Sequence, residues 1–397
     1  MLIGLITGEY SPMQGGVGDF TARLGQALAE VGHRVHVITG KAQNPDLKSQ
    51  IPKPKAQILD PKASSSGVTV HRVVSEWGWG CWRQVLALAG ELGLEVLNLQ
   101  YQAAAYRMHP AINFVPGHQD RPPVVVTFHD LKVPYLFPKA GLLRWQVVRM
   151  LARRADGVIV TNQEDYLRLE GEIPPARMSL IPIGSNISPA SPLECDRDAE
   201  RARWGVSPDD LLLGYFGFLN ESKGGEELMR ALAILVTRGV PAHLLMIGGR
   251  VGSSDSTNWA YAERVENLIA GLGLRERVHW TGYACPRDVS MGLWATDVCV
   301  LPYRDGVSFR RGTLHACLAH GRAVVTTHPA VPLPEVRDGE NMLLVKPRDP
   351  EGLAEAVMRL AADRALRARL EAGAAALTVE FAWERIARQT AAFFRRL

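Results

Sequence analysis

Short apolar runs alternate with amphipathic stretches along the first half of the chain. Residues 2–7 form the first apolar run, and residues 19–31 place apolar side chains at the spacing of one helix face. The further strands that we expect in this half are 34–39, 68–74, 96–99, 124–128 and 158–161. Because fully apolar strands alternate with helices, the pattern predicts a parallel sheet with helices on both faces.

A stretch with prolines and serines, residues 188–195, interrupts this alternation, and we interpret it as a linker. After it we expect strands at 211–216, 242–247, 278–281, 298–301, 323–326 and 342–345, and then helical sequence over 350–397. The predicted fold class is therefore α/β, with two Rossmann-like domains in series. The proline-broken stretch 41–67 is expected to be a long, mobile surface loop.

Composition and charge narrow the function. A length of 397 residues agrees with two domains, and a net charge of +4 is too small to indicate a nucleic-acid partner. The 5 cysteines include no CxxC pair, which argues against a disulfide framework or a zinc site and favours a reducing cytoplasm. No run of about 20 apolar residues occurs. We therefore expect any membrane contact to be peripheral, at the inner face of the membrane.

Two motifs in the first half follow predicted strands. Gly15 and Gly16 stand between the first strand and the first helix, where close backbone approach and free N–H groups suit a phosphate, although a tight structural turn would look the same. The third glycine of a GxGxxG motif is replaced by Phe20, which argues against an NAD site. His129 directly follows a buried strand, where it can hydrogen-bond a sugar, act as an acid or base, or simply cap the next segment.

Two cationic motifs in the second half also follow predicted strands. Lys223 lies in a glycine-containing turn at a helix start, which suits a phosphate contact, although a solvated lysine would look the same. Arg310, Arg311, Gly312 and Thr313 form a second loop at a helix start. Adjacent arginines usually include one that faces solvent. We therefore expect at least one of the two in an anion-binding site.

Eight segments, in this order along the chain, resemble the retaining glycosyltransferases of family four, which have the GT-B fold. The segments are GGVGDF (15–20), VVVTFHDL (124–131), SLIPIGSN (179–186), FGFLNESKGGEELMRAL (216–232), VHWTGY (278–283), DVCVLPY (297–303), HACLAHGRAVVTT (315–327) and LPEVRDGENMLLVKPRDPEGLAEAV (333–357). The resemblance implies two Rossmann-like domains whose parallel sheets face across a cleft. It places an acceptor-side domain at 1–187, a nucleotide-sugar-binding domain at 188–380, and a terminal helix, 381–397, that returns to the first domain.

The resemblance also implies roles for single residues. Gly15 and Gly16 fall on the glycine loop that contacts the donor phosphate, His129 on the acceptor-side histidine near the reacting carbon, and Lys223 on the lysine that neutralises the diphosphate. It implies a hexosyl- or pentosyltransferase that uses a nucleotide-diphosphate sugar and retains the anomeric configuration. No carboxylate pair in a strand-end context suggests a metal site, so we expect no metal and no other cofactor.

The chain departs from the family at one cationic position. The family places an arginine five residues before the motif lysine, and Phe218 stands there. A benzyl group cannot hold phosphate. We expect Arg310 or Arg311 to replace the missing arginine, since a guanidinium group bridges two phosphate oxygens.

Both glutamates that the family carries before and within the motif helix are also replaced, by Ser308 and Ala316. Ser308 can still hydrogen-bond a sugar hydroxyl, and His315 is a candidate for the lost ribose contact. The losses keep a second hypothesis open, a catalytically inactive GT-B protein that serves as a binding or scaffold subunit. An epimerase or phosphorylase on the same fold is a third, but an epimerase needs an acid/base pair around the sugar that we cannot assign.

The acceptor is a glycan, a lipid or a small molecule, and two features bear on it. One feature is a group of three tryptophans after a first-half strand, Trp77, Trp79 and Trp82. We expect them either to stack on a sugar or lipid or to pack into the core. The helix expected over 141–155 is rich in arginine and leucine, so it is either an ordinary amphipathic surface helix or one that rests on an anionic membrane.

Overall fold

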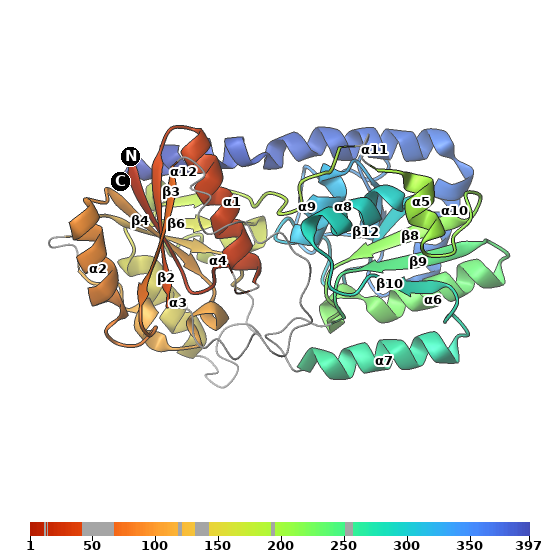
Figure 1. Ribbon diagram of the computed structural model, residues 1–397, viewed down its shortest axis with the longest axis horizontal. Coiled ribbons are helices and arrows are strands. Elements are labelled where there is room, and N and C mark those ends of the chain that lie inside the picture. Colours follow the sequence, from red (N-terminus) through yellow and green to blue (C-terminus); the bar gives the residue numbers. More distant parts are fainter. Residues whose placement is uncertain are drawn as a thin grey trace. The chain divides into compact units, whose positions relative to one another are not determined.

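The structure is a computed structural model that describes residues 1–11, 13, 15–41, 67–117, 121–131, 143–191, 195–250 and 257–397. The loop expected over 41–67 lies outside the described residues except for its two ends. The chain divides into two units (Figure 1), the first formed by Met1–Gly184 with Ala382–Leu397 and the second by Ser185–Phe381. Sequence analysis places these boundaries at 187/188 and 380/381.

The first unit contains a fully parallel seven-stranded sheet in the order β3-β2-β1-β4-β5-β6-β7. The strands are β1 (Leu2–Thr7), β2 (Arg34–Gly40), β3 (Val68–Val74), β4 (Val96–Tyr101), β5 (Val124–Phe128), β6 (Gly157–Val160) and β7 (Met178–Leu180). The alternation of apolar runs predicts the first six. Strand β7 was not predicted; of its 3 residues only Met178 is buried.

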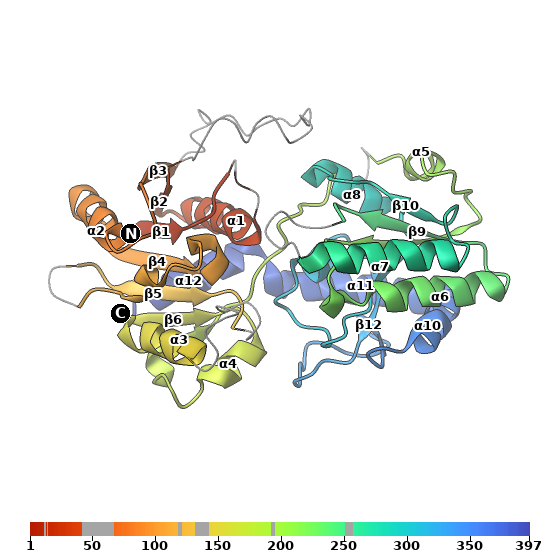
Figure 2. The ribbon, with the colours of Figure 1, turned by 90° about the horizontal axis from the view of Figure 1, so that it is seen from below.

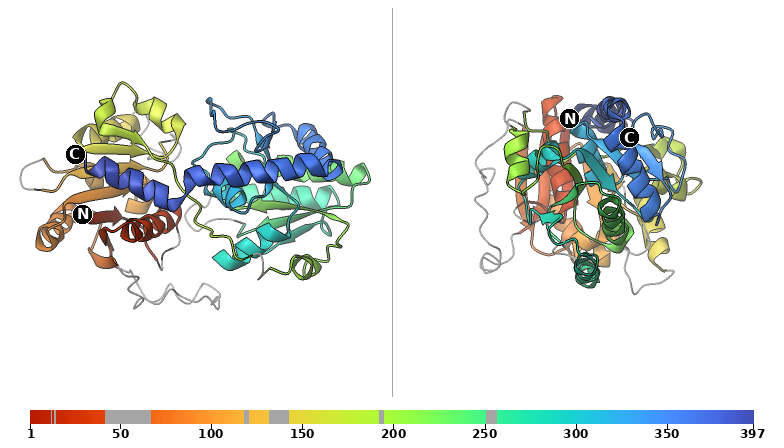
Figure 3. Two further views of the ribbon diagram at one scale, coloured as in Figure 1. Left: turned by 90° about the horizontal axis from the view of Figure 1, so that it is seen from above. Right: turned by 90° about the vertical axis from the view of Figure 1, so that its right-hand side faces the viewer.

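Helices cover both faces of this sheet, and two apolar clusters fill the space between. The helices are α1 (Gly16–Glu30), α2 (Cys81–Leu92), α3 (Leu143–Arg154), α4 (Gln163–Leu169) and α12 (Trp383–Phe394), with short 3-10 turns at η2 (Ala103–Tyr106), η3 (Pro110–Asn113) and η5 (Pro175–Arg177). The last helix, α12, packs against α1, so the C-terminal segment shares a core with the first strand and helix of the chain (Figure 3).

The second unit contains a parallel six-stranded sheet in the order β10-β9-β8-β11-β12-β13. Its strands are β8 (Leu211–Phe216), β9 (Ala242–Ile247), β10 (Val278–Trp280), β11 (Val298–Leu301), β12 (Ala323–Thr327) and β13 (Leu343–Val345). Its helices are α5 (Arg197–Ala202), α6 (Gly225–Thr237), α7 (Thr257–Gly271), α8 (Pro286–Ala295), α9 (Gly312–Ala319), α10 (Pro350–Ala362) and α11 (Arg364–Thr378), with 3-10 turns at η7 (Glu221–Lys223) and η8 (Val379–Phe381). Helices α6 and α10 lie together on one face (Figure 2).

Strand order locates the ligand-binding edge of each sheet. The chain runs outward from β1 to β3 and then returns to the other side of β1 with β4, and it does the same with β8 to β10 and β11. In open parallel sheets, ligands bind outside the carboxyl ends of the strands at such a reversal point. The loops after β1 and β4, and those after β8 and β11, are therefore the places to look for a site.

Candidate functional site

Lys223 and Thr313 both pack against Gly217, in the turn after β8. Gly217 has a φ of 117°, and a Cβ atom there would lie 2.7 Å from the Cγ2 atom of Thr313 and 3.3 Å from the Nζ atom of Lys223. Lys223 Nζ donates to the Phe218 carbonyl oxygen at 2.9 Å. Only glycine fits here, since it alone combines this backbone conformation with the absence of a side chain. The lysine is thus held at the carboxyl end of β8, against the start of α9.

The two predicted arginines both lie inside the loop after β11. Their side chains are 3% (Arg310) and 12% (Arg311) exposed, and each donates to Asp305, at 2.8 and 2.7 Å. Arg311 also lies over the ring of Tyr303 at 4.9 Å, and its Nη2 atom is 3.4 Å from Ser222 Oγ, beside the motif lysine. The structure therefore places Arg311, rather than Arg310, beside the Lys223 turn.

The surroundings of Lys223 lower the pKa of its ammonium group. Burial among protein atoms lowers it, and the neighbouring charge of Arg311 lowers it further, from 10.5 to about 7. Two cationic side chains therefore lie close together although their mutual repulsion disfavours the charged lysine. A di-anion placed between them would relieve that repulsion and satisfy both sets of donors.

Not all the predicted donor-side residues lie beside Lys223 and Arg311. Ser308 is partly exposed, and its Oγ atom is 3.5 Å from the backbone N of Arg310. His315 is only 2% exposed, and its ring donates from Nε2 to the Phe309 carbonyl oxygen at 2.7 Å. Burial lowers its pKa to about 4. This geometry disfavours the expected ribose contact and instead makes His315 an internal support for the loop that carries the arginines.

Helix α9 starts at Gly312, with Arg311 at its N-cap position. The hydroxyl of Thr313, in the first turn, hydrogen-bonds that of Tyr303 at 2.8 Å. Ala316, where the family has its second glutamate, is fully buried. The first turn of α9 therefore offers backbone N–H groups and the positive end of a helix dipole beside Lys223.

An ion cluster that the sequence motifs do not predict fixes these two loops relative to each other. Arg304 donates from Nε to Glu227 at 2.8 Å, from Nη1 to Glu221 at 3.1 Å, and from Nη2 to Glu226 at 2.5 Å. Glu226 and Glu227 begin α6, directly after the Lys223 turn. One arginine thus clamps the loop after β11 to the loop after β8. The sequence features that could have indicated this ion cluster are the three glutamates near a helix start and the arginine after a buried strand.

In the first unit, His129 lies at the end of a buried relay of amides. Asn98 Nδ2 donates to the Val125 carbonyl oxygen at 3.2 Å, and that oxygen can only accept. Asn98 Oδ1 therefore accepts from Gln100 Nε2. Gln100 Oε1 is then left to accept from His129 Nε2 at 2.9 Å. The relay places the imidazole proton on Nε2 and leaves Nδ1 as an acceptor for a hydroxyl group.

The environment of His129 keeps its ring neutral. Burial lowers its pKa to about 4, and Phe20 of α1 packs edge-on against it at 4.7 Å between ring centroids. Trp383 of α12 lies behind Phe20 at 5.3 Å. A neutral, oriented imidazole suits hydrogen bonding to a sugar hydroxyl better than binding an anion.

The glycine loop after β1 faces a carboxylate. A Cβ atom on Gly15 would lie 1.9 Å from Glu9 Oε2, whereas one on Gly16 would meet open space. The pKa of Glu9 is raised by burial and by the charge of Asp19, and that of Asp19 is raised by burial. Two adjacent carboxyl groups disfavour the phosphate contact that the family resemblance gives to this loop. They suit hydroxyl groups, which donate to them.

The two features weighed for an acceptor also have clear positions. Trp77 and Trp82 are buried in the core, but Trp79 is 70% exposed and touches the rings of His109 and Phe114, at 5.7 and 5.4 Å between centroids. One of the three tryptophans therefore belongs to an aromatic surface cluster at the carboxyl end of β3.

The arginine-rich helix is α3. Its Arg149 and Arg153 both pair with Glu172, at 2.8 and 2.7 Å, which ties part of its polar face to the protein itself. Over the described residues no helix has the length and apolarity to cross a membrane, and no group of three His, Cys, Asp or Glu side chains is arranged to hold a metal ion.

Two parallel α/β units, the second with a lysine and an arginine at the reversal point of its sheet, define a glycosyltransferase of the GT-B class. The family model described as Glycosyltransferase Family 4 matches residues 14–188, and that described as Glycosyl transferases group 1 matches residues 210–363. Together the matches take in most of both units. The chain belongs to this family of glycosyltransferases.

Curated relatives carry related names. A protein of Streptomyces bingchenggensis named D-inositol 3-phosphate glycosyltransferase is 28% identical over 60% of this chain and 52% of its own length. A Bacillus subtilis protein named putative glycosyltransferase EpsD is 30% identical over 56% of each chain. The chain thus spans about half the length of the curated relatives that it matches.

Solved structures share the fold along the whole chain. Alr3699/HepE of Anabaena, solved with UDP and glucose, is 21% identical with a TM-score of 0.73 over 100% of both chains. A sucrose-phosphate synthase from Thermosynechococcus elongatus is 23% identical with a TM-score of 0.71, over 100% of this chain and 98% of the other. At these identities the likeness shows the fold alone.

Proposed function

We propose that this protein transfers a sugar from a nucleotide-diphosphate sugar to a hydroxyl-bearing acceptor, with retention of configuration and without a metal ion. The observation that carries the donor assignment is the pairing of Lys223 with Arg311 at the carboxyl edge of the second sheet. Arg311 takes the part that the family gives to an arginine at Phe218, whose side chain is 42% exposed. The structure of HepE with UDP-glucose supports this class of donor.

Charge decides the chemistry proposed for the second unit. Cleavage of the sugar–phosphate bond leaves a nucleoside diphosphate, and negative charge grows on its oxygens in the transition state. Lys223, Arg311 and the N–H groups of α9 stabilise that charge, and a divalent cation is then not required. The acceptor oxygen bonds to the anomeric carbon as the phosphate leaves, and its proton passes to an oxygen of the departing phosphate.

In the first unit, the proposed role is recognition of hydroxyl groups. His129 presents Nδ1 as a hydrogen-bond acceptor, because its Nε2 proton is directed to Gln100. Glu9 and Asp19 add carboxyl oxygens beside the glycine loop. The exposed ring of Trp79 offers an apolar face on which a pyranose can stack. These three features favour a carbohydrate-type acceptor over an apolar one.

A second candidate function is binding without catalysis. It rests on the loss of both motif glutamates, since Ser308 carries no charge and Ala316 is fully buried and carries no polar group. A protein of this kind would bind a nucleoside diphosphate through Lys223 and Arg311 but would not turn the donor over.

One experiment separates these functions. UDP-glucose is offered as a probe donor with EDTA present, and both UDP binding by calorimetry and UDP release are measured. We expect Arg311→Gln to weaken UDP binding by about 1.5–3 kcal/mol. The matched control is Arg310→Gln, which also removes one positive charge and one ion pair with Asp305. It should weaken UDP binding less than Arg311→Gln does.

The outcomes differ for each function. UDP binding with UDP release supports the transferase, and UDP binding without release under any acceptor supports the binding protein. Equal losses in the Arg310 and Arg311 variants would contradict the donor geometry. Failure to bind UDP and every other nucleoside diphosphate would overturn both proposals.

A further inference from the structure

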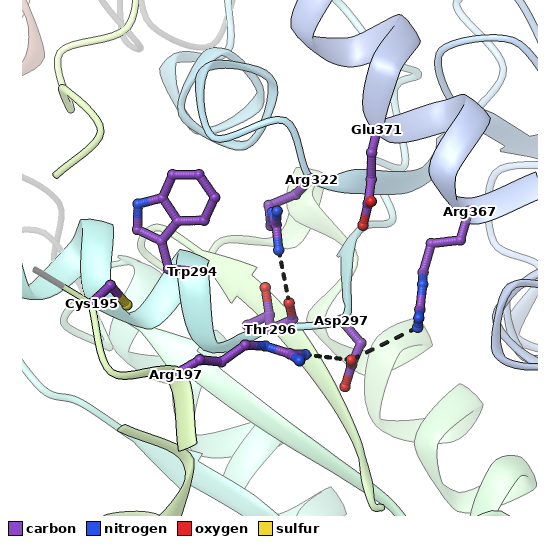
Figure 4. A pocket seen from close by; sticks show the side chains of 8 residues that line it. All are labelled: Cys195, Arg197, Trp294, Thr296, Asp297, Arg322, Arg367 and Glu371. Carbon is purple, nitrogen blue, oxygen red and sulfur yellow. Dashed lines mark hydrogen bonds and ion pairs between the residues drawn. The ribbon is translucent and has the colours of Figure 1, made fainter. Parts of the chain in front are cut away.

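A cavity lined by several arginines lies within the second unit (Figure 4). Its volume is about 390 Å³. The residues that line it include Arg197, Trp294, Asp297, Arg322, Arg367 and Glu371. The start of α5, the end of α8, the turns before β11 and β12, and helix α11 supply these side chains. None of the residues assigned to the donor pocket takes part.

The position of the cavity in the fold separates it from the donor pocket. Asp297 directly precedes β11 and Arg322 directly precedes β12, so the cavity opens at the amino ends of the strands. The Asp297 backbone N–H donates to the Leu212 carbonyl oxygen at 2.8 Å, and the Leu212 N–H donates to Asp297 Oδ2 at 2.8 Å, which joins this edge to the start of β8. The 6 residues of β8 then span about 20 Å to the Lys223 turn. The cavity and the Lys223 turn therefore lie at opposite edges of one sheet.

Three guanidinium groups surround one carboxylate beside this cavity, that of Asp297. Asp297 accepts from Arg197 at 2.5 Å and from Arg201 at 3.0 Å, and Arg367 approaches it at 3.8 Å. Burial works against charge on Asp297, but the Leu212 N–H and the arginines outweigh it and hold its pKa below the ordinary value. The carboxylate is therefore charged, already well supplied with donors, and unable to hydrogen-bond Arg367 at that distance.

Arg322 is fixed in place before any ligand arrives. Its Nε donates to the His320 carbonyl oxygen at 3.1 Å, its Nη1 lies 3.4 Å from the Thr296 carbonyl oxygen, and its guanidinium stacks on Trp294 at 4.9 Å. Trp294 is itself tied to the Ala190 carbonyl oxygen at 3.2 Å. Such a side chain loses little rotamer freedom on binding, which favours a tight contact.

We propose that this cavity binds the phosphate group of a small phosphorylated molecule through Arg322 and Arg367. Its lining holds three arginines, Arg197, Arg322 and Arg367, against two carboxylates, Asp297 and Glu371, so the lining keeps a positive charge. The fork of N–H donors on a guanidinium group matches the oxygens of a phosphate. The volume lies near the lower end of the range for ligand pockets, which suits a phosphate ester of a few carbon atoms or free phosphate rather than a nucleotide sugar.

Cys195 gives this proposal a direct readout, because its partly exposed side chain lines the cavity. Cys285 is the other partly exposed cysteine, and Cys81, Cys299 and Cys317 are buried. In the Cys285→Ser protein, the rate of alkylation of Cys195 by iodoacetamide is measured against inorganic phosphate and, separately, glycerol 3-phosphate at matched ionic strength. We expect saturable protection by at least one probe, and the ratio of the two midpoints tells whether the ester adds affinity.

Variants test which arginine carries the effect. Arg367→Gln should raise the protecting concentration about tenfold, the usual weight of one charge-assisted hydrogen bond. Arg364→Gln lies on the same helix with an exposed side chain and should change nothing. Arg322→Gln, which removes the other proposed phosphate contact, should raise the protecting concentration similarly and is the second test should Arg367→Gln misfold. Lys223→Ala should keep full protection, which separates this cavity from the donor pocket.

Three results would overturn the proposal. The first is alkylation that neither phosphate nor glycerol 3-phosphate slows. The second is an equal loss in the Arg364 and Arg367 variants, which would indicate a bulk charge effect. The third is loss of protection with Lys223→Ala, which would place the phosphate in the donor pocket. The first two leave the proposed transferase activity untouched, because UDP binding is measured separately.

Discussion

Raising the pH from 7 to 9 should weaken nucleoside diphosphate binding, because Lys223 loses its proton over that range. Burial and then the charge of Arg311 lower the pKa of Lys223 to about 7 in the free protein. A bound diphosphate brings negative charge and additional hydrogen bonds to the ammonium group, and both raise that pKa. The complex therefore holds a proton that the free protein gives up.

The size of the effect follows from the protonated fraction of the free protein. With a pKa of about 7, half of the Lys223 side chains are charged at pH 7 and about one in a hundred at pH 9. UDP affinity should fall about 50-fold between these values if the pKa in the complex lies above 9, with a limiting slope near tenfold per pH unit.

Calorimetry with UDP between pH 7 and 9 measures this slope. Most of the titration of the terminal phosphate lies below this range, near pH 6. Buffers with different ionisation enthalpies report the proton taken up on binding. Lys223→Arg is the matched control, because a guanidinium group stays charged throughout and should give a flat profile. Lys223→Met should bind UDP weakly, with an affinity that does not change between pH 7 and 9.

Fold stability should move in the opposite direction. The pKa of Lys223 in the folded protein is about 7, below the ordinary 10.5 of an unfolded chain, so the unfolded state binds more protons between these values. This group therefore makes the free protein more stable as the pH rises through that window, while nucleotide affinity falls. A UDP affinity that is constant from pH 7 to 9, or a slope that persists in Lys223→Arg, would refute the reasoning.

Four further predictions concern single changes. Gly217→Ala should weaken UDP binding and lower stability by about 1–3 kcal/mol, since its φ of 117° and the 2.7 Å approach to Thr313 exclude a side chain; calorimetry and thermal melts check this. Gln100→Leu should lower the turnover number with UDP affinity unchanged, because His129 loses the partner that sets its tautomer; an unchanged rate contradicts it. Trp79→Ala should raise the acceptor KM while thermal stability is unaffected, because its side chain is 70% exposed. Transfer should survive EDTA, and activity that returns only with added magnesium or manganese would show the metal-free mechanism to be wrong.

Sequence patterns located the sheets well, because strands buried on both faces leave continuous apolar runs. Residues 2–7, 211–216 and 242–247 match β1, β8 and β9 at both ends. Helix starts were less certain. Helix α1 begins at Gly16, three residues before the apolar periodicity shows it, since its first turn is made of glycine and valine with no capping side chain.

The candidate site was only partly predictable. Lys223 and the pair Arg310 and Arg311 stand out in the sequence because they are cationic residues at helix starts after predicted strands, and their role in donor binding stays a prediction. The relay behind His129 was not, although Asn98 and Gln100 alternate with leucines inside a buried strand, and buried amides require partners. The contact between Glu9 and Gly15 could not be foreseen, because it depends on how a turn folds back on the helix start.

The return of α12 to the first unit has a consequence for biosynthesis. Ile386, Ala387, Ala391 and Phe393 complete an apolar cluster with β1 and α1, and Phe393 covers Gly157. On the ribosome, the first unit emerges early but lacks this helix until the whole second unit has been translated. At about 5–20 residues per second, that interval is on the order of 10–40 s. Throughout this interval the apolar side chains of α1 and β1 that α12 covers are exposed, so the nascent first unit is expected to bind chaperones. For the same reason, a truncation that removes α12 should destabilise the core of the first unit.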